Sequence, residues 1–360
     1  MYENKMENIR ALTPKININR YIDSLPSNTR TINVSGRRIY SLPDLSRFTE
    51  LTELICSNNY LTSLPKLNKT LKFLCCDRNK LTELPSLNDK LEQLDCSNNQ
   101  LEELPNLNVN LIFLNCSFNI LKVLPHLNEN LQELYCSFNI LKVLPHLNEN
   151  LQELYCKRNQ LTELPVLNKN LNKLDCNANN LTQLPQLNEN LEELCCSHNY
   201  LTRLPILNKH LKRLICLNNN LYCLPQLNEN LSELDCSFNQ INSLPILNEK
   251  LALLYIYDNV VCTVLYGNRY NKKFLINLKN RWQPVVYGTN MSKICLNHKL
   301  NILNTFRYTY YCLKFKKHFK RWLWERVREP KIMAKFHPSH LTNLEETDDL
   351  EVFLDDWINK

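Results

Sequence analysis

Cysteine is the residue type whose number and spacing most suggest chemistry in this chain. Of sixteen cysteines in 360 residues, ten recur at intervals of twenty residues. They are Cys56, Cys76, Cys96, Cys116, Cys136, Cys156, Cys176, Cys196, Cys216 and Cys236. A column of parallel side chains does not converge as a tetrahedral zinc site or a disulfide requires. The column therefore predicts small apolar residues of a packed core, in a reducing, cytoplasmic compartment.

Other cysteines and histidines are weaker candidates for chemistry. Cys75 and Cys195 directly precede members of the column, so we expect them to alternate to the outside of the same strands as exposed thiols. Cys295-x-x-His298 and His337-x-x-His340 have the residue types of zinc ligands. Only one cysteine takes part, however, and spacing alone is a weak signal. We predict no metal and no cofactor.

The motifs that would indicate catalysis do not occur in the sequence. The chain has three glycines, too few for a phosphate-cradling loop, and it contains neither H-E-x-x-H nor G-x-S-x-G. An enzyme that worked through Cys295 or Cys312 would need a base beside the nucleophile, and the sequence shows none. No stretch reaches the roughly 18 apolar residues of a membrane span, and the polar N-terminus does not resemble a signal peptide. We predict a non-catalytic protein.

The elements that must position these residues are ten units of twenty residues, which run from Leu51 to Lys250 without an insertion. Each unit reads L-x-x-L-x-C-x-x-N-x-L-x-x-L-P-x-L-N-x-x with few departures, and its positions are called places one to twenty below. A fixed period of this length predicts a solenoid in which each unit contacts only its neighbours. Cys116–Tyr135 and Cys136–Tyr155 are identical, as expected of an array that lengthens by whole units.

The pattern within a unit predicts its local structure. Leucines at places one, four, eleven, fourteen and seventeen should point inward, and the alternation from place four to place six has the period of a strand. Stacked strands would form a parallel sheet. Leu-Pro at places fourteen and fifteen predicts an extended opposite wall, because proline disfavours helix in the residue before it. Asn at place nine should bond the backbone of a buried turn and stack into a ladder, and Asn at place eighteen should form the return turn.

The regions around the regular units differ in composition, and together they predict five segments. Residues 1–28 form a lead-in and a partial cap, and we expect the backbone of residues 1–24 to be irregular. Residues 29–50 are a degenerate capping unit, 51–250 are the regular array, and 251–270 are a closing unit. Residues 271–360 form a basic and then acidic C-terminal region that is mostly helical.

The C-terminal region offers one candidate binding activity. Between residues 261 and 336 there are 17 Lys or Arg against two Glu, with aromatic residues interleaved. Such a segment could contact nucleic acid or an anionic membrane surface, or it could be a solvated basic face. The residues proposed for that contact are Lys314, Lys316, Lys317, Lys320 and Arg321.

The outward places of the middle units offer a second candidate. Their aromatic residues are Phe113, Phe118, Tyr135, Phe138 and Tyr155. Charged residues flank them, namely Asp95, Asp175, Asp235, Arg78 and Arg158. An aromatic centre with a charged rim is typical of a protein-binding patch. The alternative is that copying of one unit duplicated Phe118 into Phe138.

The motif of places one to eighteen resembles the short leucine-rich repeats of bacterial type III secreted effectors, which share N-x-L-x-x-L-P-x-L. The resemblance covers residues 51–250 and departs from the family at two places, where Cys replaces Val or Leu and Asn replaces the second Pro. It implies an α+β solenoid, a leucine-rich repeat horseshoe with a parallel concave β-sheet and an extended convex wall, plus a small, mostly helical tail. About 100 residues after the repeats are too few for the ubiquitin-ligase domain of some of those effectors.

A second resemblance concerns the tail. The fragment Leu323–Pro338, followed by an acidic end, is similar to the C-termini of proteins from amoeba-infecting giant viruses, and the chain is rich in Asn, Lys and Ile. The chain therefore resembles a mimivirus-type leucine-rich repeat protein. This implies a protein-interaction role with an unidentified, host protein as partner, in the host cytoplasm, and it brings no catalytic residue.

Overall fold

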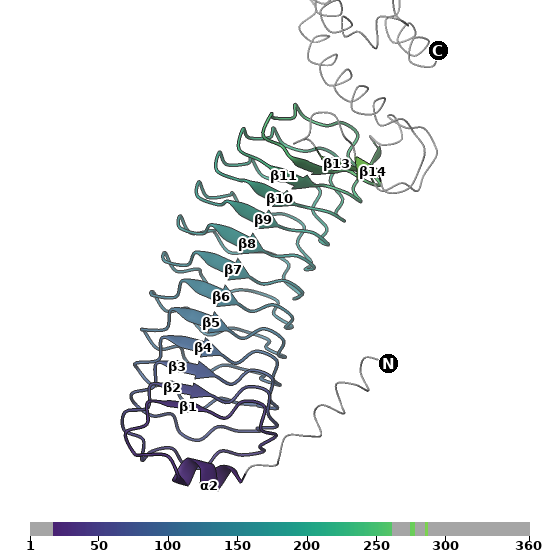
Figure 1. Ribbon diagram of the computed structural model, residues 1–360. Helices are drawn as coiled ribbons and strands as arrows, with labels where there is room; N and C mark the ends of the chain where they lie inside the picture. The colour runs from purple at the N-terminus through teal and green to yellow at the C-terminus, as the bar shows by residue number, and fades with distance from the viewer. Residues whose placement is uncertain (1–16, 261–273, 278–284, 287–360) are drawn as a thin grey trace, which may run out of the picture. The chain divides into compact units, whose positions relative to one another are not determined.

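The computed structural model describes residues 17–260, together with the backbone of residues 274–277 and 285–286 (Figure 1). Within these residues the chain forms successive coils of one solenoid, and each coil contributes one short strand to a common sheet. No helix among the described residues is long and apolar enough to cross a membrane.

The described chain begins with a short helix, α2 (Ile18–Asp23), where the sequence predicted an irregular lead-in. The side chain of Asn17 caps it by accepting the backbone N–H of Arg20 at 3.2 Å. Ile22 is buried, and Arg47 donates hydrogen bonds to the carbonyl of Ile22 and, at 3.2 Å, to that of Leu25. A helix of one and a half turns is unstable alone, so these tertiary contacts explain why local sequence did not reveal it.

Twelve strands of three residues each form the parallel part of the sheet. They are β1 (Thr31–Asn33), β2 (Glu53–Ile55), β3 (Phe73–Cys75), β4 (Gln93–Asp95), β5 (Phe113–Asn115), β6 (Glu133–Tyr135), β7 (Glu153–Tyr155), β8 (Lys173–Asp175), β9 (Glu193–Cys195), β10 (Arg213–Ile215), β11 (Glu233–Asp235) and β12 (Leu253–Tyr255). From β2 onward each residue pairs with the residue twenty positions later, as Tyr135 does with Tyr155. This register confirms the parallel sheet predicted from the repeat.

The strands occupy places three to five and so begin one residue earlier than the predicted alternation. Pairing nevertheless continues through place six, because the backbone N–H of Cys116 donates to the carbonyl of Tyr135 at 2.8 Å. Place four points inward and places three and five point outward, as the alternation requires.

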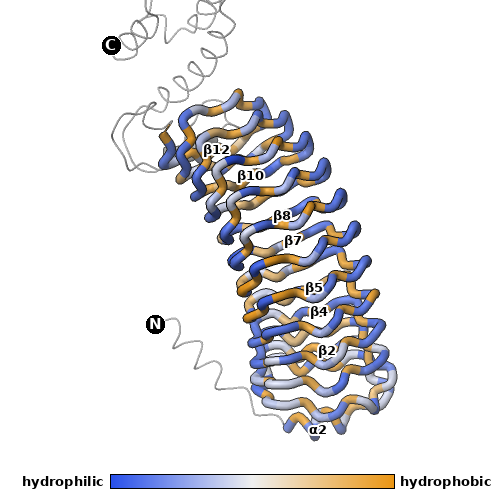
Figure 2. The backbone as a smooth tube through the Cα atoms, turned by 180° about the vertical axis from the view of Figure 1, so that it is seen from behind, coloured by the Kyte–Doolittle hydropathy of each residue, from blue (hydrophilic) through white to orange (hydrophobic). Residues whose placement is uncertain are grey.

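Leucine and cysteine columns form the core of the solenoid. Leu131, Leu134, Cys136 and Leu141 of one unit are fully buried, and every member of the cysteine column is equally inaccessible. Each buried aliphatic side chain contributes on the order of 2 kcal/mol relative to exposure. Figure 2 shows apolar segments at the same point of successive coils. The cysteine column is therefore part of the packed core, as predicted.

The wall opposite the sheet contains neither helix nor strand between places eleven and seventeen of the regular units. This confirms the extended wall that Leu-Pro predicted. Leu124 and Leu164 at place fourteen retain 8% and 9% exposure, respectively, so this wall is less completely buried than the strands.

Asparagine ladders join the coils at two turns. The amide of Asn119, at place nine, donates to the carbonyls of Cys116 and Cys96 at 3.1 Å, and its oxygen accepts the N–H of Leu101 at 3.0 Å. At place eighteen Asn108 donates to the carbonyls of Asn88 and Leu91 at 2.8 and 3.1 Å. Each amide bridges neighbouring coils, which confirms the predicted ladder and return turn and satisfies buried backbone groups.

Place eight has a left-handed backbone in every unit, with φ between +46° and +57°. Asn, Arg, Phe, Ala, His and Asp all occur there, although side chains larger than Asn seldom adopt this conformation. Hydrogen bonds from the next coil hold the turn, as when the N–H of Phe118 donates to the carbonyl of Ser137 at 2.8 Å. The residue at this place is thereby directed away from the strand that precedes it.

The direction of pairing changes after β12. The strand β13 (Phe274–Asn277) pairs antiparallel with β12, and β14 (Val285–Val286) pairs antiparallel with β13. Both lie within 271–360, the segment predicted to be mostly helical, so that segment begins with strands. The helices expected further along fall outside the described residues.

Candidate protein-binding surface

The outward side chains of β1 to β12, at places three and five, form what we call the sheet face. Most of these side chains are partly buried by one another, in the alternating pattern of a sheet with one covered side. Because each strand has three residues, the sheet face is two side chains wide along every strand.

Three of the predicted aromatic residues lie in contact across the sheet face. The rings of Phe113 and Tyr135 are 5.5 Å apart between centroids and tilted by 41°, and those of Tyr135 and Tyr155 are 4.5 Å apart and 7° from parallel. We call this row the tyrosine stack. It extends over β5, β6 and β7 because the duplicated unit places tyrosine at the same place of adjacent strands.

The hydroxyls of the tyrosine stack are bonded to carboxylates on the same strands. Tyr135 donates to Oε2 of Glu133 and of Glu153, each at 3.2 Å, and Tyr155 donates to Oε2 of Glu153 at 3.2 Å. Lys173 on β8 donates to the other oxygen of Glu153 at 2.7 Å. The side chains of three adjacent strands thus form one hydrogen-bonded network that joins the tyrosine hydroxyls.

The protonation states follow from these contacts. Burial raises the pKa of Tyr135 and of Tyr155, and the nearby glutamates raise them further. Burial also acts to raise the pKa of Glu153, but the hydrogen bond and charge of Lys173, together with the hydrogen bonds from Tyr155 and Tyr135, outweigh it and the net pKa is lowered. At neutral pH the phenols are therefore neutral donors and Glu153 is an anionic acceptor.

The two remaining predicted residues, Phe118 and Phe138, form a separate row. They occupy the left-handed place eight beyond the strands, and their rings stack 4.1 Å apart at 13°. The guanidinium of Arg158, at the same place of the next coil, lies 5.2 Å from the centroid of Phe138. Phe118 is 46% exposed. We call this row the phenylalanine stack; the five predicted residues thus belong to two rows.

The charged residues around the aromatic rows are more numerous than the sequence prediction assumed. The sheet face carries eight carboxylates, Glu53, Asp95, Glu133, Glu153, Asp175, Glu193, Glu233 and Asp235. Against these it carries two cations, Lys173 and Arg213. The glutamates at place three were not recognised from the sequence, although their recurrence at this place in five of the ten regular units was a usable signal. Burial raises the pKa of Asp175 and of Asp235.

No protein-family model matches the chain, and no curated protein matches it significantly. The leucine-rich repeat domain of APL1 matches 65% of this chain and 69% of its own at 23% identity, with a TM-score of 0.55. That of APL1B matches 64% and 76% at 24% identity, with a TM-score of 0.51. YopM from Yersinia enterocolitica is 32% identical over 72% of both chains, with a TM-score of 0.41.

The chain has the leucine-rich repeat fold. In this leucine-rich repeat protein the path of each coil is determined by the strands, the extended wall and the two asparagine ladders. The residue types on the sheet face and at the turns beside it can therefore vary from unit to unit. The tyrosine stack and the phenylalanine stack occupy those variable places. Their residues are therefore not required by the repeat itself.

The two cysteines at place five differ from the exposed thiols that the sequence predicted. Cys75 and Cys195 are partly buried, and burial raises the pKa of each to about 11. Such thiols remain protonated at neutral pH and are poor nucleophiles. Among the described residues, the fully exposed cysteine is Cys223, on the wall opposite the sheet.

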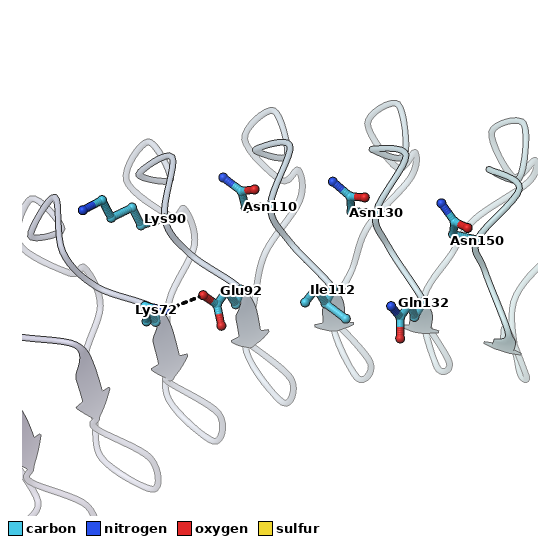
Figure 3. A pocket seen from close by; sticks show the side chains of 8 residues that line it. All are labelled: Lys72, Lys90, Glu92, Asn110, Ile112, Asn130, Gln132 and Asn150. Carbon is cyan, nitrogen blue, oxygen red and sulfur yellow. Dashed lines mark hydrogen bonds and ion pairs between the residues drawn. The ribbon is translucent and has the colours of Figure 1, made fainter.

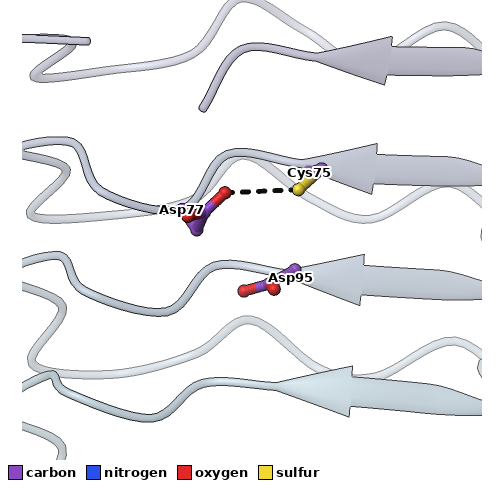
Figure 4. Close-up of side chains that lie close together, drawn as sticks. All are labelled: Cys75, Asp77 and Asp95. Carbon is purple, nitrogen blue, oxygen red and sulfur yellow. Dashed lines mark hydrogen bonds between the residues drawn. The ribbon is translucent and has the colours of Figure 1, made fainter. Parts of the chain in front are cut away.

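Cys75, Asp77 and Asp95 form the one group of three metal-ligand side chains found among the described residues, with their ligand atoms within 4.8 Å of one another (Figure 4). The thiol of Cys75 donates to Oδ1 of Asp77 at 3.3 Å and lies 3.2 Å from the hydroxyl oxygen of Ser57. Three groups, one of them a protonated thiol, fall short of the four ligands of a structural zinc site. The arrangement is that of a hydrogen-bonded thiol.

A polar groove of about 660 Å³ lies where the chain enters the strands, lined by places twenty and two of consecutive coils (Figure 3). Most of its polar side chains are already engaged. Lys72 pairs with Glu92 at 2.7 Å, and the amides of Asn110 and Asn130 donate to the carbonyls of Asp89 and Val109 at 2.6 and 2.8 Å. This groove is part of the bonding between coils.

Several predicted candidates lie outside the described residues. These are Lys314, Lys316, Lys317, Lys320 and Arg321 of the proposed anion contact. The same holds for the weak zinc candidate at Cys295, His298, His337 and His340.

Proposed function

We propose that the protein is a non-catalytic protein-interaction scaffold that binds a partner protein on the sheet face, the concave face of a leucine-rich repeat horseshoe. The observation that carries the proposal is the tyrosine stack, in which three rings contact one another across adjacent strands and remain partly exposed. Rigid aromatic groups fixed by their own contacts lose little entropy on binding, and interfaces are enriched in them.

The phenylalanine stack supports the same proposal from beside the strands. Phe118 and Phe138 stack at the same turn of adjacent coils, and Arg158 completes the row. Aromatic side chains exposed together at a surface are typical of an interaction site. The similarity of the tail to giant-virus proteins adds the proposal that the partner is a host protein and that the encounter takes place in the cytoplasm.

Affinity capture from host lysate tests this function. The full chain is compared with a variant that carries Tyr135→Ser and Phe138→Ser. The matched control carries Tyr40→Ser and Tyr60→Ser, which disrupt a stacked pair 5.2 Å apart elsewhere on the solenoid. We expect a protein that is captured by the full chain and the control and lost from the first variant. Equal capture by all three chains would contradict a role for the aromatic rows.

A second candidate function belongs to the C-terminal region. The surplus of 15 positive charges between residues 261 and 336 favours contact with nucleic acid or an anionic surface, with the repeats as a spacer. Such binding should weaken steeply as salt is raised, because phosphate contacts release counterions, whereas binding through aromatic contacts should not. Replacement of Lys314, Lys316, Lys317, Lys320 and Arg321 by Gln would abolish it and leave capture through the sheet face intact.

A further inference from the structure

We propose that the sheet face recognises a basic, extended polypeptide segment, and that an arginine or lysine of this segment lies against the tyrosine stack beside Glu133. The proposal rests on the proposed function and specifies the chemistry of its partner. Four features of the solenoid support it.

Charge is the first feature. Residues 17–260 contain 25 acidic and 22 basic side chains, a nearly balanced set. The sheet face takes eight of the acids and two of the bases, so the rest of the described solenoid has more bases than acids. The negative charge of the solenoid is therefore gathered on the face that carries the tyrosine stack. A field of one sign on a binding face favours a partner of the opposite sign.

The second feature is the set of carboxylates that lack a cation. Lys173 pairs with Glu153 at 2.7 Å, and Arg213 pairs with Glu233 at 3.0 Å and with Glu193 at 3.9 Å. Both cations of the sheet face are thus engaged. Among residues 17–260, the other five carboxylates of this face form no ion pair. These five are Glu53, Asp95, Glu133, Asp175 and Asp235.

The third feature is the local geometry at Glu133. Its Oε2 accepts the hydroxyl of Tyr135 at 3.2 Å, which fixes the carboxylate beside the ring, and its Oε1 has no partner among the described residues. The rings of Phe113 and Tyr155 lie on either side of Tyr135, so an arginine would pack its aliphatic stem against the exposed rim of the stack while its guanidinium donates to the neighbouring carboxylate. The tyrosine stack and Glu133 together offer both contacts.

Cations already lie over rings elsewhere in this solenoid, and this is the fourth feature. Arg158 lies over Phe138 at 5.2 Å, Lys80 over Tyr60 at 5.3 Å and Arg37 over Tyr21 at 4.6 Å. Among the described residues, no such contact is made to the rings of Phe113, Tyr135 and Tyr155. The tyrosine stack, on the face that gathers the carboxylates, therefore has no cation of the described chain over its rings.

The spacing of the free carboxylates indicates the form of the ligand. Glu133, Asp175 and Asp235 lie on β6, β8 and β11, so five strand intervals separate the first from the last. At about 4.8 Å per interval this is roughly 24 Å, the length of about seven extended residues. An extended segment with several cations can meet all three. Nucleic acid would be repelled by the same carboxylates.

The test uses the full chain and three fluorescent nonapeptides, with arginine, lysine or glutamate at alternate positions and alanine between. Fluorescence polarisation should show binding of the arginine and lysine peptides and none of the glutamate peptide. We expect Glu133→Gln to weaken binding of the arginine peptide about fivefold to tenfold. The matched control Glu163→Gln, on an exposed place of the opposite wall, should leave the affinity unchanged.

The outcomes separate this inference from the proposed function. If neither basic peptide binds while the captured partner is still lost from the Tyr135→Ser, Phe138→Ser variant, the basic-segment inference fails and the scaffold function stands. If Glu133→Gln and Glu163→Gln weaken binding equally, the site at Glu133 is overturned. If the peptides bind only after the five tail cations, Lys314, Lys316, Lys317, Lys320 and Arg321, are replaced by Gln, the chain's own tail is the occupant and the commitment to a partner is overturned.

Discussion

The hydroxyl of Tyr135 and a carboxylate oxygen of Glu153 lie 3.2 Å apart on adjacent strands, and Tyr155 donates to that same oxygen. One carboxylate therefore fixes two stacked rings, and Lys173 fixes the carboxylate in turn. The tyrosine stack is held in place before any partner arrives, which lowers the entropy that binding would cost.

The coupling between the two tyrosines is measurable. In a double-mutant cycle of Tyr135→Ala and Tyr155→Ala, we expect a coupling free energy of about 1 kcal/mol in unfolding, since stacked aromatic pairs contribute that much beyond burial. Urea unfolding of the four chains gives the value. The control cycle combines Tyr135→Ala with Tyr255→Ala on β12, where the two changes should be additive. Additivity in both cycles would show that the stack contributes nothing to stability.

The ion pair between Lys173 and Glu153, whose carboxylate also accepts the hydroxyls of the tyrosine stack, leads to a prediction about pH. Lys173→Gln removes the hydrogen bond and charge that lower the pKa of Glu153 most, so this pKa should rise. A depressed pKa stabilises the folded chain above the unfolded value of 4.5, and this contribution is lost as pH falls through the folded pKa. The variant should therefore differ from the native chain more at pH 7 than at pH 3. Side-chain carboxyl NMR checks the pKa, and Lys122→Gln, at a distant pair, should leave Glu153 unchanged.

The place-nine ladder predicts a large cost for one amide. Asn119→Ala leaves the buried N–H of Leu101 without its acceptor and removes one of the two amide donors to the carbonyls of Cys96 and Cys116, which Asn99 and Asn139 still contact. We expect a loss of about 1–3 kcal/mol in unfolding free energy. Asn106→Ala, at an exposed place of the opposite wall, should change it by less than about 0.5 kcal/mol. Similar unfolding midpoints for the two variants would mean that water replaces the amide at the turn.

Much of this fold could be predicted from the sequence because the repeat fixes its own register. Leu134 and Cys136 lie two residues apart in a unit whose copies are identical at every core place, so only one alternation buries them all. The place-nine ladder could be predicted for a similar reason. Every regular unit has Asn at this place among buried residues, so its amide is expected to satisfy backbone groups. The helix at Ile18–Asp23 could not be found this way, because its stability comes from contacts with residues such as Arg47.

The candidate site was predicted only in outline. The sequence prediction grouped Phe118 and Phe138 with Tyr135 as outward residues of one patch, but the outward direction of a strand applies only to residues within that strand. Place eight lies past the strand in a left-handed turn, and the residue types there gave no glycine signal for it. The sequence therefore could not show that these two phenylalanines form a row apart from the tyrosine stack; only the structure shows it. The acidic character of the sheet face was readable from the glutamates at place three, and it was missed.

The cysteine column predicts sensitivity to alkali. Burial raises the pKa of Cys116 and Cys136 far above the ordinary thiol value, so the folded chain keeps protons that the unfolded chain loses. Stability that is present below the unfolded pKa of 9.0 is then lost as pH rises toward the folded one, by about 1.4 kcal/mol per pH unit for each thiol. We expect Cys116→Ala with Cys136→Ala to reduce this slope by about 2 kcal/mol per pH unit, measured by urea unfolding between pH 9 and 10.5, where the unfolded thiols are only partly ionised at the lower limit. Cys223→Ala, an exposed thiol, is the control and should leave the slope unchanged.

Deletion of one duplicated unit tests the binding surface without disturbing the fold. Removal of residues 136–155 joins Tyr135 to Cys156, a junction identical to the native one between Tyr155 and Cys156. Each coil contacts only its neighbours, so the shortened chain should fold with the register and both ladders intact. Circular dichroism and thermal unfolding check this.

The same deletion shortens the tyrosine stack to Phe113 and Tyr135 and removes the phenylalanine stack, because it leaves one tyrosine and one phenylalanine where the native chain has two adjacent copies of each. Capture of the partner should therefore fall to the level of the Tyr135→Ser, Phe138→Ser variant. Deletion of residues 76–95, a unit without an aromatic residue, is the matched control and should retain capture. A shortened chain that folds and still captures as well as this control would remove the aromatic rows from the binding surface, since the rest of the sheet face is unchanged by the deletion of residues 136–155 except for one glutamate.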